Sequence, residues 1–416
     1  METKRYSAYS FVLILAMFVL FALSSGIAYS FGLYHLIFLE VFQKGSTITA
    51  WISSINMGMQ GFVAPVASLL SDRIGLKWTA MVGGFLSFVG LLVTAFAPNI
   101  HVVFFSIGIL TGIGFGIVYT MGTVVIALHF DRWRPIALAI AQSGLNVGSF
   151  VYPIFGEWIL GVYGWRGTML VTSALTLNMV AAGAVIREKL PTQAEKSADD
   201  AESKPTQSGR RQMWTNWKYW LCHVLCFFMY FALISFTTHI ASYAQYLGHS
   251  DSNTVMLISI QALSGFICRN GLSFVASLQR TDIYWLLFVT TLVPGLCHFM
   301  VTFSDSFVML CVSTMLHSII YGTIGPVFIE VICLILGAED FALGYGCLEV
   351  SMAVGALLGP PASGFAYEGS GSYETSFYVT GTSLIIAAFC TIPLALNRNT
   401  QSTVISESET KEVNNV

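Results

Sequence analysis

The sequence has little charge: Asp, Glu, Lys and Arg together make up 10% of its 416 residues. Because soluble domains carry about 25% charged residues, this composition excludes an ordinary soluble fold. The net charge of −3 gives no indication of a nucleic-acid partner. Hydrophobic residues, in contrast, make up 55% of the chain, and its mean hydropathy is +0.72. The chain is therefore predicted to be a membrane protein that crosses the bilayer many times.

Motifs for catalysis and metal binding are missing as well. The sequence contains no phosphate-binding loop, no Gly-x-Ser-x-Gly motif and no His-Glu-x-x-His motif. Its eight cysteines all lie in the second half, within apolar runs and without the grouping of metal ligands. We therefore expect reduced, buried thiols, no cofactor, no metal site and no enzymatic activity.

Long apolar runs predict twelve transmembrane helices, so the predicted fold class is an all-α membrane protein. Their approximate limits are 9–38, 46–70, 78–97, 100–128, 135–161, 168–187, 216–247, 254–278, 282–303, 306–336, 340–367 and 373–396. A polar linker, 188–215, divides them into two six-helix bundles, 9–187 and 216–396, while 1–8 and 397–416 are polar ends, the latter predicted to be disordered. Sixteen of the nineteen Lys and Arg residues then fall on one side. This asymmetry predicts that the linker and both termini are cytosolic.

The span 254–278 contains a single full charge, Arg269. A guanidinium is effectively always protonated, and placing one at the bilayer centre costs at least about 2.5 to 3.5 kcal/mol. The next cation, Arg280, lies eleven residues further on, so Arg269 is expected roughly 16 Å deeper in the membrane. We interpret Arg269 as a substrate-binding residue that holds an anionic group. A structural ion pair with Glu349 or Glu330 is the alternative.

Two local patterns concern gating and packing. Gly75, in the loop between the second and third spans, permits a tight turn. The charged residues around it are predicted to gate by pairing with neighbouring helix ends; they are Asp72, Arg73 and Lys77. Small residues along the fifth and fourth spans form lanes that let another helix approach closely; they are Ala137, Ala141, Gly144 and Gly148, and Gly108, Gly112 and Gly116.

The two-half layout and the loop from Ser71 to Lys77 resemble those of major facilitator carriers. The stretch from Phe130 to Gly148 resembles the signature of the monocarboxylate transporter family of that superfamily, as do the later segments 163–167 and 357–361. The resemblance spans essentially the whole membrane part. It keeps Arg269 but places other residues where the proton-coupled members have a lysine, an aspartate and a proline; these are Leu33, Gly265 and Asn270. The sequence is therefore similar to a divergent, less characterised branch of the family.

The remaining candidates are polar residues within apolar spans. Glu349 and Glu330 match positions of the family and are predicted to take part in proton coupling or gating, because burial penalises the charged form of a carboxyl group. Further substrate-binding candidates are Tyr34, His35, Tyr119, Asn146 and Asn270. For all of these residues, hydrogen bonding or packing between helices is the alternative role.

These observations predict a transporter, secondary-active or facilitative, that moves small organic anions or zwitterions bearing a carboxylate by alternating access. The residues Leu33 and Gly265 favour facilitated or differently coupled transport over symport with protons, and Glu349, Glu330 or His35 leave proton coupling open. The alternatives are a carrier of neutral or amino-acid-like solutes and a non-transporting membrane sensor with the same fold. The resemblance further implies a plasma-membrane location and a single-span accessory glycoprotein as partner.

Overall fold

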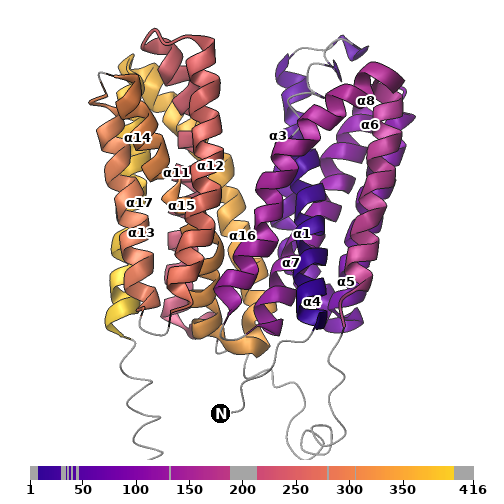
Figure 1. Cartoon of the computed structure of the whole chain (residues 1–416), viewed down its shortest axis with the longest axis horizontal. Helices are drawn as coiled ribbons and strands as arrows, with labels where there is room; N and C mark the ends of the chain where they lie inside the picture. The colour runs from indigo at the N-terminus through magenta and orange to yellow at the C-terminus, as the bar shows by residue number, and fades with distance from the viewer. Residues whose placement is uncertain are drawn as a thin grey trace, which may run out of the picture.

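The computed structural model describes residues 8–29, 34, 37–38, 41–43, 46–130, 133–187, 213–278, 281–304 and 306–397. All regular secondary structure in these ranges is helical, which confirms the predicted all-α class. The helices form two groups that stand side by side (Figure 1), one built from the first part of the chain and the other from the second. We call them the N-terminal half and the C-terminal half.

The N-terminal half extends from α1 to α8. Its helices are α1 (Ala8–Tyr29), α3 (Ser46–Phe62), α4 (Ala64–Ile74), α5 (Leu76–Ala95), α6 (Ile100–Val103), the π-helix η1 (Phe104–Thr111), α7 (Gly112–His129) and α8 (Arg134–Ala184). The predicted span 46–70 is divided into α3 and α4 at Val63, because Pro65 in the first turn of α4 has no N–H to continue the preceding helix. The predicted turn at Gly75 is confirmed by its φ of 88°.

The C-terminal half extends from α11 to α17. Its helices are α11 (Trp217–Tyr246), α12 (Asp251–Ala276), α13 (Ile283–Val301), α14 (Phe307–His317), α15 (Ile319–Gly322), the π-helix η2 (Thr323–Val327), α16 (Phe328–Ser370) and α17 (Tyr373–Leu396). Side-chain oxygens cap the start of several helices of this half by accepting a hydrogen bond from a backbone N–H; they belong to Asn216, Ser250, Asp282, Ser306 and Ser372. Asn99 caps α6 of the N-terminal half in the same way.

Helices α8 and α16 each contain two helical segments that meet at one non-helical glycine, and each of these glycines lies between two predicted spans. They are Gly164, whose φ and ψ are 65° and 179°, and Gly337, at 70° and 178°. Glycine adopts a positive φ without a steric penalty, so each chain reversal needs one residue and no loop. Eight helices of the described ranges are long and apolar enough to cross a membrane. The count of twelve spans stays a prediction.

The predicted lanes of small residues lie where helix backbones come closest. A side chain at Gly144 would collide with the carbonyl group of Phe18 on α1, and one at Gly148 would collide with that of Ala22. The second lane, on η1 and α7, faces α3, because a Cβ atom at Gly112 would lie 2.9 Å from the carbonyl oxygen of Asn56. These contacts confirm the packing role of both lanes.

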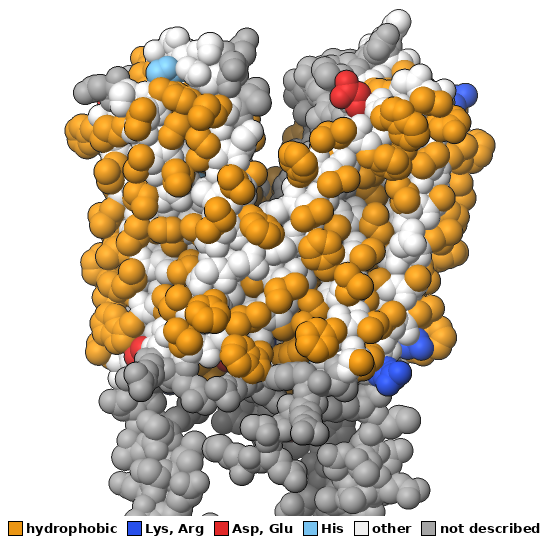
Figure 2. Space-filling view, in the orientation of Figure 1, with side chains coloured by type: hydrophobic (Ala, Val, Ile, Leu, Met, Phe, Trp, Pro, Cys, Tyr) orange, Lys and Arg blue, Asp and Glu red, His pale blue; other side chains and the backbone are white. Residues whose placement is uncertain are grey.

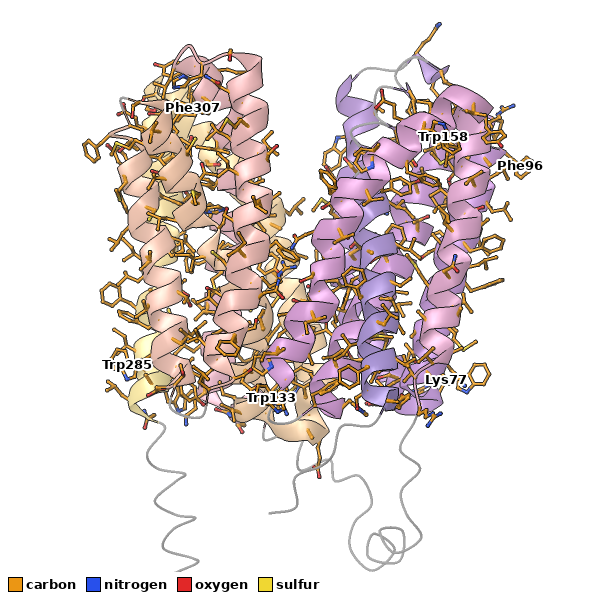
Figure 3. All side chains as sticks on the ribbon, in the orientation of Figure 1. Lys77, Phe96, Trp133, Trp158, Trp285 and Phe307 are labelled. Carbon is orange, nitrogen blue, oxygen red and sulfur yellow. The ribbon has the colours of Figure 1, made fainter. Side chains whose placement is uncertain are left out.

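The two halves touch at one end and diverge at the other. The contacts between them join α16 to α3, α4, α7 and α8, and join α8 to α12 and η2. They lie toward the end at which Figure 3 labels Lys77, Trp133 and Trp285. At the opposite end, the space-filling view shows a hollow between the halves, and hydrophobic side chains cover much of the lateral surface (Figure 2). We call the end near Lys77 the closed end.

Candidate functional site

Arg269 reaches from α12 to the N-terminal half. The side chain is 7% exposed, and its Nη1 donates a hydrogen bond of 2.8 Å to the backbone carbonyl of Gln142 on α8. A helix carbonyl has two lone pairs, so the Gln142 oxygen can accept from Arg269 in addition to its bond within the helix. Tyr321 on α15 lies within electrostatic reach of the guanidinium. The cation therefore sits at the interface of the two halves.

Asn270 extends this contact. Its Nδ2 donates a hydrogen bond of 3.1 Å to the hydroxyl of Ser143 on α8 and one of 2.9 Å to the carbonyl of Phe266 on its own helix. Arg269 and Asn270 are neighbours on α12, and their partners Gln142 and Ser143 are neighbours on α8. The structure thus brings together two of the predicted substrate-binding residues at one polar crossing of α8 and α12.

Two buried amide groups on α8 lie beside this crossing. The Nε2 of Gln142 and the Nδ2 of Asn146 are buried and have no hydrogen-bond partner among the described residues. A buried donor left without an acceptor costs about 1 to 3 kcal/mol, so these two groups favour the arrival of a ligand oxygen. Asn146 is a predicted substrate-binding residue, and Gln142, a polar residue of the same apolar span, lies one helical turn before it.

Glu349 is buried where α16 of the C-terminal half contacts α7 of the N-terminal half. The carboxyl group is 5% exposed and accepts a hydrogen bond of 2.5 Å from the hydroxyl of Thr120. Tyr345, one turn earlier on α16, lies next to the carboxyl group, and Tyr119 lies near Tyr345. Tyr119 also packs edge-on against Phe21, with ring centroids 5.5 Å apart. The alternative role of Glu349 as an ion-pair partner of Arg269 has no support here, since Thr120 is its partner across the interface.

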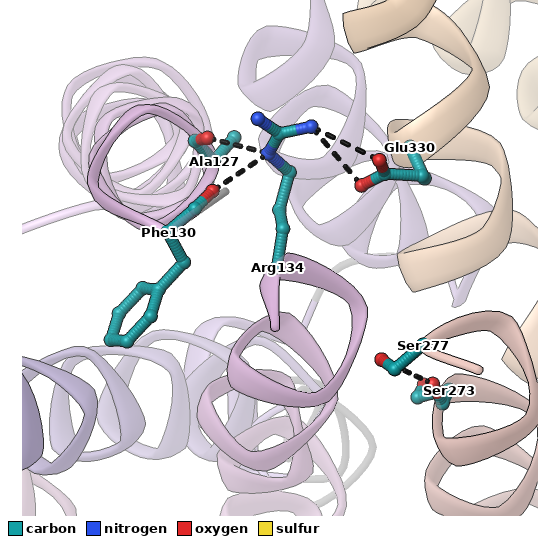
Figure 4. Close-up of polar contacts among 6 residues, drawn as sticks. All are labelled: Ala127, Phe130, Arg134, Ser273, Ser277 and Glu330. Carbon is teal, nitrogen blue, oxygen red and sulfur yellow. Dashed lines mark hydrogen bonds and ion pairs between the residues drawn. The ribbon is translucent and has the colours of Figure 1, made fainter. Parts of the chain in front are cut away.

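Glu330 forms an ion pair between the halves at the closed end. Arg134 directs Nη1 to both carboxylate oxygens, at 3.2 and 3.1 Å, and its Nε donates to the carbonyls of Ala127 and Phe130 at 2.7 and 3.0 Å. Figure 4 shows this arrangement, with Arg134 between α7 and α16. Glu330 therefore pairs with Arg134, at the start of α8, and its predicted structural pairing with Arg269 is not the one that the structure shows.

The other predicted residues lie away from this interface or outside the described residues. Tyr34 is 1% exposed, and its hydroxyl lies 2.5 Å from that of Tyr152 within the N-terminal half, so its contact with substrate stays a prediction. Asp72 and Arg73 are exposed at the end of α4, and the ammonium group of Lys77 lies 5.8 Å from the ring centre of Trp78. Their gating role also stays a prediction. His35 lies outside the described residues.

Gly265 shows how this chain fills the position where the resemblance places an aspartate. The ring of Tyr321 packs against it, because a Cβ atom at Gly265 would lie 3.1 Å from Cδ2 of that ring. A larger residue at this position would push Tyr321 away from α12. The packing therefore explains why glycine fits here, and it brings the tyrosine close to Arg269.

Two helical halves that meet through polar contacts, enclose a buried cation and present an apolar lateral surface define a multi-pass membrane transporter. Comparison with known proteins assigns the family. The chain belongs to the Major Facilitator Superfamily, whose family model matches residues 6–304 and 278–414. The predicted resemblance to monocarboxylate transporters is confirmed by the relatives that the chain matches.

Among these relatives, monocarboxylate transporter 13 of Rattus norvegicus is 28% identical over 97% of this chain and 95% of its own length. Monocarboxylate transporter 3 of Gallus gallus is 24% identical over 91% and 77%. The fold is similar to that of the E. coli fucose:proton symporter FucP, with a TM-score of 0.73, 16% identity and coverage of 92% of this chain and 98% of that one. The human organic anion transporter MFSD10 has a TM-score of 0.69 at 14% identity, with 93% and 100% covered. The protein is thus a transporter and not an enzyme.

Proposed function

We propose that this transporter moves small carboxylate-bearing solutes and that Arg269 binds the carboxylate. The observation that carries the proposal is the cluster of donors between the halves: the Arg269 guanidinium, with the buried amide groups of Gln142 and Asn146 beside its α8 partner. Arginine forms charge-assisted, often bidentate hydrogen bonds to carboxylates, and amide N–H groups add neutral ones. The relatives named monocarboxylate transporters support the same substrate class.

The contacts at the closed end support transport by alternating access. The bonds Arg134–Glu330 and Thr120–Glu349 join the two halves and must break before this end can open. We assign Glu330 and Glu349 to gating on this ground, and Asp72, Arg73 and Lys77 to the same movement by the resemblance. With the closed end and both termini in the cytosol of a plasma-membrane protein, the structure corresponds to a state open to the outside. The resemblance also motivates an accessory single-span glycoprotein as partner.

A carrier of neutral solutes is the second candidate. The amide groups of Gln142 and Asn146 bind hydroxyl oxygens as well as carboxylates, and in that case Arg269 would serve only to join α12 to α8. The two candidates differ in what the positive charge does: a carboxylate needs it, whereas a neutral solute needs only the donors.

The test is uptake of a panel of labelled monocarboxylates, amino acids and sugars into proteoliposomes. The variants are Arg269→Ala, Arg269→Lys and, as a matched control, Arg166→Ala, which removes an exposed arginine next to Trp165. We expect uptake of one or more carboxylates by the wild type and the control, a loss of at least about 100-fold with alanine, as for a charged hydrogen bond of about 3 kcal/mol, and partial activity with lysine, which keeps the charge but not the planar fork.

Other outcomes overturn the proposal. Uptake of only neutral solutes would refute the carboxylate assignment and favour the second candidate. Full carboxylate uptake by Arg269→Ala would show that another residue binds the anion. Binding of a carboxylate to the wild type without any flux would identify a sensor that retains the fold.

A further inference from the structure

A pair of histidines is buried in the C-terminal half, away from the contacts between the halves. His298 on α13 and His317 on α14 are both 0% exposed, and the Nε2 of His298 lies 2.8 Å from the Nδ1 of His317. Their rings stack on Phe236 of α11, with centroid distances of 4.4 and 3.9 Å. No part of the proposed gate or of the donor cluster around Arg269 uses these two side chains.

The hydrogen bonds around the pair allow one proton assignment that leaves a free nitrogen, and we adopt it here. When the hydroxyl of Thr380 donates to the carbonyl of Phe377 at 3.1 Å, it accepts from the Nδ1 of His298, 2.9 Å away. A neutral imidazole carries one N–H, so the Nε2 of His298 is an acceptor. His317 must then donate from Nδ1. Its Nε2 is left as a bare lone pair, buried and without a hydrogen-bond partner among the described residues.

A chain of contacts leads from the ring of His317 to Arg269. Tyr321 lies one turn after His317, and the centroids of the two rings are 6.2 Å apart. The hydroxyl of Tyr321 accepts a hydrogen bond of 3.2 Å from the Nε2 of Gln261 on α12. The same tyrosine lies within electrostatic reach of Arg269. A ligand bound at Arg269 would therefore lie next to the aromatic ring that separates the guanidinium from the histidine pair.

Among the described residues, the surroundings of the pair offer no counter-charge. The titratable side chains on the packed helices are Tyr243 on α11, Cys297 on α13, Tyr321 on α15 and Tyr373 on α17, and the cation Arg269 on α12 acts on Tyr321. Among the described residues, no carboxylate acts electrostatically on either imidazole. A proton added to the Nε2 of His317 is stabilised by the face of Phe236, but it has no anion until one is supplied.

We propose that His317, oriented by His298 and Thr380, binds the proton that is transported together with the carboxylate. The Nε2 lone pair takes up one proton to form an imidazolium ion, and release of the proton on the other side of the membrane restores the neutral ring. The bound carboxylate supplies the missing negative charge near Arg269 and Tyr321. Each ligand thus raises the affinity for the other by the same factor. This inference rests on the proposed function.

The experiment measures two fluxes in proteoliposomes that contain a pH-sensitive dye: proton entry driven by a carboxylate gradient, and exchange of labelled carboxylate at equal concentrations on both sides. The carboxylate is the one that the wild type transports in the uptake panel. The main variant is His317→Asn, whose side-chain amide can replace the Nδ1–H donor but offers no counterpart to Nε2. The control is His239→Asn, which changes a histidine that contacts the Pro360 carbonyl at 3.2 Å.

We expect wild type and control to carry protons with the carboxylate, and to take it up faster at pH of about 6 than at about 8, because the proton is then a co-substrate whose binding and carboxylate binding favour each other. His317→Asn should keep exchange while carboxylate-driven proton entry falls below about one tenth of the wild-type value, as expected when the coupling site is lost. Thr380→Val removes the acceptor that sets the proton positions and should also reduce proton entry, whereas Thr380→Ser should not. These Thr380 variants keep the test decisive if His317→Asn does not fold.

Proton entry by His317→Asn at the wild-type ratio to carboxylate would overturn the inference. Exchange by the wild type without any proton entry would overturn it as well, and would leave the proposed carboxylate transport intact. Absence of carboxylate exchange in the wild type would instead refute the proposed function, and this inference with it. Unchanged proton entry in Thr380→Val would show that the direction of the hydrogen-bond chain does not control coupling.

Discussion

The ion pair between Arg134 and Glu330 offers the sharpest test of the gate, because it spans the two halves and both side chains are largely buried. Their exposed fractions are 15% and 17%, and one guanidinium nitrogen contacts both carboxylate oxygens at 3.1 to 3.2 Å. Glu330→Gln keeps the shape of the side chain and one neutral hydrogen bond but removes its charge. The remaining bonds of Arg134 to the Ala127 and Phe130 carbonyls stay within the N-terminal half.

The expected change follows from the difference between the two kinds of hydrogen bond. A bond to a charged group contributes about 1.5 to 3 kcal/mol and a neutral one about 0.5 to 1.5 kcal/mol, so the closed end loses about 1 to 2 kcal/mol. Because each 1.4 kcal/mol changes an equilibrium constant tenfold, the ratio of open to closed at this end should rise by about 5- to 30-fold.

Spin-label distance measurements can report this ratio. Cysteines carrying labels replace Trp78 and Trp285, which are 55% and 43% exposed on opposite halves, in a protein whose native cysteines are replaced by serine. Glu330→Gln should gain a population with a longer distance between the labels. Glu339→Gln, which neutralises an exposed carboxylate on the same helix, should not. A distance distribution in Glu330→Gln that matches both the wild type and this control would refute the reasoning.

Two further predictions concern the interior of the bundles. Gly148→Leu should lower the melting temperature by several degrees, because its side chain would collide with the Ala22 carbonyl and overpacking costs about 1 to 3 kcal/mol or more. The control Gly161→Leu should leave the melting temperature unchanged, because nothing lies within 4 Å of its Cβ position. Equal melting temperatures for the two variants would contradict the close packing of α1 on α8. Thr120→Val should open the closed end in the same label assay by removing the bond to Glu349, and its effect should be non-additive with that of Glu349→Gln, whereas strict additivity would show that the bond does not couple the halves.

The candidate site could be predicted only in part, and particular residues show why. Arg269 is identifiable because a fixed charge in an apolar span is costly whatever surrounds it, and Asn146 and Asn270 because amides within such spans seek partners. Glu330 is identifiable as a buried carboxylate, but its partner is not. The sequence offers Arg269 as the obvious cation, whereas the structure places Arg134 beside it, 196 residues away along the chain.

The sequence by itself determined the membrane class, the positions of the apolar segments and the close packing of the glycine lanes. Composition, hydropathy and helical spacing are local properties, and they act on every segment in the same way wherever it lies. The tertiary structure alone decided which polar groups meet: Arg269 with the Gln142 carbonyl, Glu349 with Thr120, and His298 with His317. These contacts depend on how each helix is rotated and tilted against its neighbours. That arrangement is set by the packing of the whole assembly, which no single segment encodes.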